Sequence, residues 1–181
     1  MGLFGKLFGG GESAVSAAPA GPHWEAKVTR DDFTDRVTGQ IQYLDKQSAD
    51  YAGFGLTDND AALVFSAANI RADSYASHYS DVFAVRIDDG EVIDLPASGA
   101  RLSSSQEWLY AILPPTLAAK LVKAMRSGRR LRIRYDQISG GYRSLDLPLV
   151  GFNAAWVQFD AALSGTQALR EMAEAASAEA Q

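Results

Sequence analysis

The sequence predicts an α+β fold: mainly an antiparallel, β-sandwich-like sheet, with one amphipathic helix packed on it and a C-terminal helical tail. Short runs in which apolar and polar residues alternate fill the chain after residue 22, as expected for half-buried strands. A helical pattern with one apolar face follows Pro114-Pro115. Because strands cluster first and helices come later, the order does not fit alternating βαβ units.

Composition divides the 181 residues into three zones. Residues 1–22 contain Gly9-Gly10-Gly11 and a stretch of Ala, Ser, Pro and Gly, which is typical of a flexible linker. Residues 23–163 hold nearly all the aromatic and β-branched residues and are expected to form a β-rich globular domain. Residues 164–181 are rich in Ala, Glu and Gln, and predict a polar helical tail with Thr166 as its N-cap.

Alternation marks the expected strands of the first half of the globular domain. Two of these runs flank Asp88-Asp89-Gly90, which is typical of a β-hairpin. Another follows a turn at residues 57–60, where Asp and Asn gather. The expected strands in this half are 24–29, 40–43, 63–65, 82–87, 91–95 and 108–113.

The helical pattern runs from Pro115 to Gly128. Proline suits the first helical position, because its missing N–H has no partner within the helix there. Glycine is expected to end the helix in the left-handed conformation, which it adopts at little cost. The expected buried face consists of Leu117, Ala118, Leu121, Val122 and Met125.

After the helix, residues 130–135 predict a strand with an apolar and a basic face. Ser139-Gly140-Gly141 predicts a turn, and residues 144–150 predict more β structure. Residues 154–163 form a short apolar stretch that favours a helix. The total is about seven strands, one strong helix and one or two C-terminal helices.

Composition also excludes several classes of function. The chain has no cysteine, so disulfides, thiolate zinc sites and cysteine nucleophiles are excluded. The net charge of −5 argues against a globally basic nucleic-acid binder. The sequence contains no run of about 18 apolar residues, so no membrane-spanning helix is expected.

The N-terminal residues carry the most unusual local pattern. On a helix, Leu3, Phe4, Leu7 and Phe8 would share one side, and Lys6 would lie away from them. This pattern is typical of a segment that lies at a membrane surface or docks on a protein. The alternatives are packing on its own domain or on a neighbouring copy, and a mobile terminus without a role.

A basic stretch is the second candidate site. Seven basic residues between Lys120 and Arg134 have no acidic residue among them, and they would suit an anionic ligand. The alternative is a solvated face paired with the chain's own Asp and Glu residues. No aromatic residue is interleaved on the arginine face, so sequence-specific nucleic-acid binding is not expected. The candidate anion-binding residues are Lys120, Lys123, Arg130, Arg132 and Arg134.

Catalytic and metal-binding patterns are weak. Asp58 and Asp60, and the pair Asp88-Asp89, fall at expected turns and do not complete a calcium loop. His23 and His78 are the only histidines, and neither lies in a catalytic motif. We therefore expect no enzyme, no metal and no cofactor, with a small enzyme that uses Asp58, Asp60 or His78 as the least favoured alternative.

Several short pieces resemble a family of small bacterial β-rich domains found in type VI secretion-associated accessory proteins and in invasion-associated-locus-B-like and phage-encoded proteins. The likeness extends over residues 23–163. It implies a β-sandwich-like domain and brings no catalytic residues. The pieces are Trp24-Glu25-Ala26-Lys27-Val28, Asp32-Phe33-Thr34-Asp35, Val85-Arg86-Ile87-Asp88-Asp89-Gly90, Leu131-Arg132-Ile133-Arg134 and Leu147-Pro148-Leu149-Val150-Gly151-Phe152-Asn153-Ala154-Ala155.

Together these features predict a non-catalytic binding or accessory domain. The N-terminal apolar segment, Leu3–Phe8, would attach it to a membrane surface or a larger assembly. The alternative is a structural component of a phage particle or a secretion machine. The expected location is the cytoplasm or the periphery of a membrane, with a virion as the alternative, and a homo-oligomer is left open.

Overall fold

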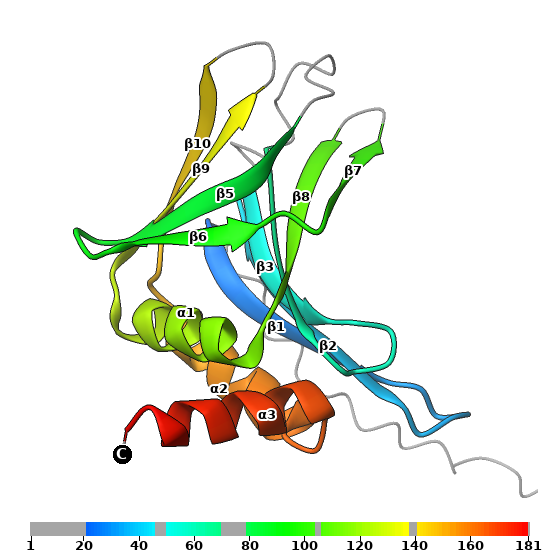
Figure 1. Ribbon diagram of the computed structural model, residues 1–181. Helices are drawn as coiled ribbons and strands as arrows, with labels where there is room; N and C mark the ends of the chain where they lie inside the picture. Colours follow the sequence, from blue (N-terminus) through cyan, green and yellow to red (C-terminus); the bar gives the residue numbers. More distant parts are fainter. Residues whose placement is uncertain (1–20, 46–49, 70–78, 104–105, 138–140, 181) are drawn as a thin grey trace, which may run out of the picture.

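A computed structural model gives the structure of the chain and describes residues 21–45, 50–69, 79–103, 106–137 and 141–180. Within these residues the chain forms ten strands and three helices (Figure 1). The elements are β1 (His23–Arg30), β2 (Val37–Leu44), β3 (Asp50–Leu56), β4 (Leu63–Asn69), β5 (Tyr79–Ile87), β6 (Val92–Pro96), β7 (Gly99–Ser103), β8 (Gln106–Leu113), α1 (Pro115–Ser127), β9 (Arg130–Gln137), β10 (Tyr142–Pro148), α2 (Phe152–Leu163) and α3 (Gln167–Ala178).

The strands form two antiparallel sheets. The first has the order β1-β2-β3-β4-β8-β7, and the second has the order β10-β9-β5-β6. Apolar side chains join the sheets: the rings of Phe65 in β4 and Phe83 in β5 stack with their centroids 6.0 Å apart. At one edge, the indole N–H of Trp24 in β1 donates to the carbonyl of Pro148 in β10, at 2.7 Å. The predicted α+β fold is confirmed.

The three helices lie together at one end of the sheets (Figure 1). Helix α1 buries four of the five residues expected from its pattern, namely Ala118, Leu121, Val122 and Met125. Leu117 is half-buried, and Ala119 is buried although the pattern did not include it. Helix α2 packs on β1 and β2, and α3 packs on α1. The segment expected to be a polar helical tail therefore has a buried side, formed by Ala168 and Leu169. Thr166 does occupy the N-cap position of α3, but its hydroxyl donates backward to the carbonyl of Leu163 and makes no cap.

Two strands are absent from the sequence prediction, and one backbone conformation was predicted wrongly. The described residues form ten strands where about seven were expected. The predicted segments coincide with eight of the ten, and the strands missed are β3 and β7. Gly128 is extended, with φ −82° and ψ 170°, so the left-handed end predicted for α1 is wrong. Glycine is required there for space, because a Cβ at this position would overlap Cγ2 of Ile87.

Candidate functional site

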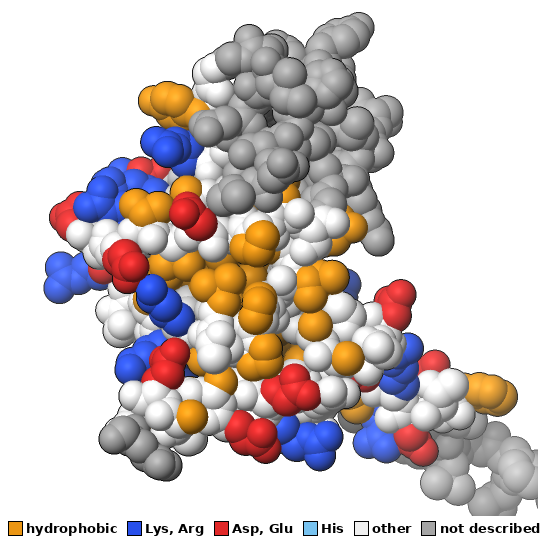
Figure 2. All heavy atoms as spheres, in the orientation of Figure 1, with side chains coloured by type: hydrophobic (Ala, Val, Ile, Leu, Met, Phe, Trp, Pro, Cys, Tyr) orange, Lys and Arg blue, Asp and Glu red, His pale blue; other side chains and the backbone are white. Residues whose placement is uncertain are grey.

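The hairpin of β1 and β2 extends beyond the rest of the domain. We call residues 27–38 the arm; it projects from the lower right of the domain in Figure 1. Residues 27–36 are all exposed, in contrast to Trp24 at the start of the same strand, which is buried. At the tip of the arm stands Phe33, with 97% of its surface exposed. Figure 2 shows hydrophobic atoms at the end of this projection, with basic and acidic side chains nearer the domain.

Local hydrogen bonds hold the tip of the arm in one conformation. The carboxylate of Asp31 accepts the backbone N–H of Phe33 at 2.8 Å and that of Thr34 at 3.3 Å. Asp31 N–H donates to the carbonyl of Arg36 at 2.8 Å, which closes the loop. Asp35 takes a positive φ of 55°, and its carboxylate pairs with Arg30 at 2.7 Å. The short polar residues thus form a turn that Asp tolerates well.

This arrangement is suited to binding another molecule. Burying one Phe side chain is worth about 1.5–3 kcal/mol, and in the described structure that free energy is not used for folding. Aromatic side chains are frequent among the residues that dominate binding energy in protein interfaces. A tip that is already ordered loses less conformational entropy when it binds. The arm therefore presents an aromatic anchor in a fixed geometry.

The carboxylate of Asp31 should control the order of the tip. Hydrogen bonds from the Thr34 side chain, and then from the backbone of Phe33 and Thr34, hold the pKa of Asp31 below its ordinary value of 3.8. A lowered folded-state pKa means that this stabilisation is present above pH 3.8 and is lost as the pH falls through the lowered pKa. We expect the amide NMR signals of Phe33 and Thr34 to titrate below pH 3.8. The variant Asp31→Ala should abolish that titration and speed amide exchange at the tip.

Asp32→Ala is the matched control for this titration, because the Asp32 side chain makes no hydrogen bond to a described residue. In Asp32→Ala, the amide signals of Phe33 and Thr34 should change with pH as they do in the unaltered chain. Equal effects of the two substitutions would show that net charge, and not the Asp31 hydrogen bonds, orders the tip.

The basic stretch is largely paired within the chain. Arg130 forms a two-point contact with the carboxylate of Asp146, whose hydrogen bonds raise the pKa of Arg130. Arg132 reaches the carboxylate of Asp89 at 3.0 Å and also donates to the carbonyl of Asp88. Lys120 pairs with Glu91 at 2.9 Å. These contacts follow the alternative in which the basic residues pair with the chain's own acids.

Two of the candidate anion-binding residues make no ion pair with a described residue, and they lie on different elements. Lys123 is exposed on α1, and Arg134 lies on β9, with its guanidinium 5.9 Å from the ring centre of Tyr142. Arg134 borders a depression of about 290 Å³ on the four-stranded sheet, together with Arg86, Arg132, Ser144 and Asp146. Asp146 pairs with Arg130 and Asp89 pairs with Arg132, whereas Arg86 and Arg134 make no ion pair with a described residue, so the depression keeps part of its positive charge.

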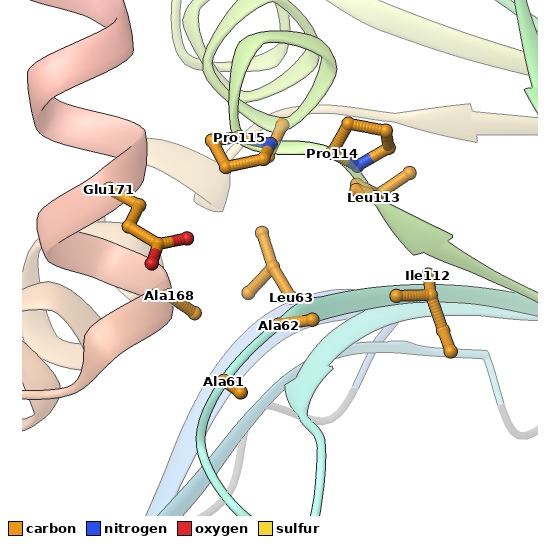
Figure 3. A pocket seen from close by; sticks show the side chains of 10 residues that line it. Ala61, Ala62, Leu63, Ile112, Leu113, Pro114, Pro115, Ala168 and Glu171 are labelled. Carbon is orange, nitrogen blue, oxygen red and sulfur yellow. The ribbon is translucent and has the colours of Figure 1, made fainter.

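A second cavity, of about 250 Å³, lies between α1, α3 and the adjoining ends of β4 and β8 (Figure 3). Its lining is apolar except for Glu171, whose carboxylate extends toward it from α3. Pockets for small molecules usually measure about 300–1,000 Å³ and carry several polar groups that orient the ligand. This cavity is smaller and has one such group. Its other lining residues are Ala61, Ala62, Leu63, Ile112, Leu113, Pro114, Pro115, Ala118 and Ala168.

One residue of each acidic pair, Asp60 and Asp88, has a structural role. Asp60 adopts a positive φ of 57° in its turn and lies 3.7 Å from Arg36. The carboxylate of Asp88 accepts the backbone N–H groups of Arg129 and Arg130, and so fixes the start of β9. The described residues contain no group of three or more His, Asp or Glu side chains that could hold a metal ion.

Several residues singled out from the sequence cannot be placed. The N-terminal set of Leu3, Phe4, Lys6, Leu7 and Phe8 lies outside the described residues, as does His78. His23 is described, and its Nδ1 lies 2.7 Å from the carbonyl oxygen of Gly21. Sequence reasoning did not single out Phe33 as a site. The available signal was a large aromatic inside an acidic turn, Asp31-Asp32-Phe33-Thr34-Asp35.

Comparisons with protein-family models, curated proteins and solved structures found no match to this chain. Among the described helices, none combines the length and the apolar character needed to cross a bilayer.

Proposed function

We propose that this chain is a non-catalytic binding domain of a larger protein assembly, and that the arm is its docking element. The observation that carries the proposal is Phe33, almost fully exposed at the tip of a hydrogen-bonded turn. The partner would offer an apolar pocket large enough for one phenyl ring. The N-terminal segment Leu3–Phe8 would supply a second attachment, joined to the domain through residues of linker-like composition.

The charge of the arm favours a protein partner over an anionic membrane. Asp31, Asp32 and Asp35 are balanced by Lys27, Arg30 and Arg36, so the arm carries no net charge. Membrane-binding segments usually carry an excess of Lys or Arg beside their aromatic residues, and the arm has no such excess. A protein pocket bordered by hydrogen-bond donors would suit both the ring and the carboxylates.

The chemistry of the cavities supports a binding role over catalysis. General acid–base chemistry needs a titratable group within reach of substrate, and efficient sites usually combine several such groups. The cavity beside α3 has Glu171 as its single ionisable group. In the depression on the four-stranded sheet, Asp146 is engaged by Arg130 and Arg132 is engaged by Asp89. Neither arrangement supplies a free acid–base pair.

Removal of the Phe33 ring should weaken assembly. In extracts of the producing cells, we expect the full chain to sediment with a complex and Phe33→Ala to shift toward the free fraction. Loss of an interface residue of this kind costs about 2 kcal/mol or more, which is roughly a 30-fold loss of affinity. Val150→Ala is the matched control, because Val150 is 82% exposed but lies between β10 and α2.

Two outcomes of the sedimentation experiment distinguish the alternatives. If Phe33→Ala and Val150→Ala both sediment like the unaltered chain, the arm is not the docking element. Removal of residues 1–12 tests the N-terminal attachment separately. If removal of residues 1–12 releases the chain from membrane fractions and Phe33→Ala does not, the membrane-surface alternative replaces the proposal.

A further inference from the structure

Among the described residues, strand β1 forms a long edge of the six-stranded sheet. It pairs with β2 in an unbroken register of eight residues, and no described strand lies on its other side. Free edges of this kind are usually shortened, bulged, interrupted by proline or covered, because they invite pairing with another chain. The other edge strands are protected in these ways: β7 and β6 have five residues each, and β6 and β10 end in proline.

The side chains of β1 are complementary to a second, antiparallel β1. In an antiparallel pair, two residues directly opposite each other point to the same face of the sheet. Two identical strands related by a two-fold axis must therefore place one residue, the centre of the pair, opposite its own copy. With Ala26 at the centre, Glu25 faces Lys27 of the second copy, and Lys27 faces its Glu25. Centring on Lys27 or on Glu25 would instead place like charges opposite each other. Of these three registers, only the one centred on Ala26 places opposite charges face to face.

Lys27 is available for such a pair. It is exposed and makes no ion pair with a described residue. Glu25 is partly held by neighbours, since Gln42 donates a hydrogen bond to it and His23 lies 3.7 Å away. In the same register Val28, which is 39% exposed, lies opposite Trp24 of the second copy. Pairing would therefore also cover an exposed apolar side chain.

Helix α2 is positioned to pack against its counterpart in the second copy. It begins over Trp24, where the rings of Trp24 and Phe152 are 5.0 Å apart, and ends over Gly39, where Leu163 and Phe159 lie. It therefore runs along β1. With its axis midway over β1 and β2, and strands about 4.8 Å apart, two such helices would lie about 10 Å apart, near the usual 8–10 Å.

The flank of α2 that faces away from α1 is shaped for this contact. Asn153 accepts a hydrogen bond from Arg126 of α1 at 2.8 Å, which marks the flank toward α1. The other flank carries Ala154, Gln158 and Ala162 at i, i+4 spacing, and all three are exposed. Two alanines in such a row allow the helix backbones to approach closely.

We propose that two copies of this chain form a two-fold symmetric dimer through antiparallel pairing of their β1 strands about Ala26, with the α2 helices packed across the axis. The tips of the two arms lie beyond the paired residues and stay free. The dimer is independent of the docking role of Phe33, so either can fail without the other.

Single cysteines test the register, because the chain has no cysteine of its own. In the proposed dimer the two Ala26 Cα atoms lie about 4.5–5.5 Å apart, within the range that a disulfide spans. Under mild oxidation, Ala26→Cys should form a covalent dimer. Val28→Cys is the control, since its two copies would lie about 14 Å apart at 3.4 Å per residue. An equimolar mixture of Glu25→Cys and Lys27→Cys should yield the mixed dimer well beyond the twofold excess over either homodimer that random pairing gives.

Charge reversal tests the same contact without cysteine. By sedimentation equilibrium, Lys27→Glu should weaken the dimer about tenfold or more, because two attractive cross-strand pairs become repulsive. The double variant Glu25→Lys/Lys27→Glu should restore most of the affinity. Lys123→Glu, on an exposed face of α1, should change nothing. The proposal fails if the chain stays monomeric at 100 μM, if Val28→Cys cross-links as readily as Ala26→Cys, or if the double variant is no tighter than Lys27→Glu.

Discussion

Replacing Trp156 with alanine is expected to lower the free energy of unfolding by about 3–5 kcal/mol. Trp156 is 2% exposed and joins α2 to the six-stranded sheet. Its ring lies 5.8 Å from Phe54 of β3, edge to face, and 5.4 Å from Phe159 of its own helix. Truncation removes this aromatic contact and leaves a cavity that the surrounding strands cannot fill. Urea denaturation followed by circular dichroism measures the change.

The adjacent residue gives the control. Val157→Ala truncates a side chain that is 52% exposed on the same helix, and it should change the free energy of unfolding by less than about 0.5 kcal/mol. If Trp156→Ala cost less than about 1.5 kcal/mol, or no more than Val157→Ala, α2 would not be packed on the sheet as described.

A methyl group at Gly53 is expected to cost about 1–3 kcal/mol of stability. A Cβ on this residue of β3 would overlap the carbonyl oxygen of Ile41 in the neighbouring strand, and would lie 2.7 Å from the hydroxyl oxygen of Tyr51. Backbone cannot move aside as the end of a side chain can. Thermal or chemical unfolding of Gly53→Ala gives the value.

Gly55, two residues further along β3, is the matched control. A Cβ there meets no heavy atom within 4 Å, so Gly55→Ala should leave stability unchanged or raise it by a few tenths of a kcal/mol. Similar losses at both positions would mean that the glycines serve backbone flexibility and that close packing at Gly53 is not the cause.

These glycines also explain why β3 could not be predicted from the sequence. The segment Asp50–Leu56 does not alternate, because Tyr51, Ala52, Gly53 and Phe54 are buried in succession. With buried or glycine residues on both of its faces, this part of the strand has no polar side to reveal it in the sequence. In contrast, β1 and the hairpin of β5 and β6 lie where their alternation and the Asp-Gly turn predicted them.

The candidate site depended on information that one sequence does not contain. Pairing of Arg130 with Asp146 follows from the register of β9 and β10, which places Asp146 opposite Arg132 and beside Arg130. The exposure of Phe33 depends on where α2 ends. Because α2 stops over Gly39, no described element covers the hairpin beyond that point. Phe33 is therefore exposed to solvent, although a large aromatic residue would be expected in the core.

Photo-cross-linking from residue 33 tests the docking role of the arm most directly. A photoreactive phenylalanine analogue would replace Phe33 in the full chain within the producing cells, with position 150 as the equally exposed control. We predict one discrete product from position 33, whose added mass differs from the 19.4 kDa of a second copy, and its absence from position 150. No product from position 33, or the same products from both positions, would contradict a docking role for the arm.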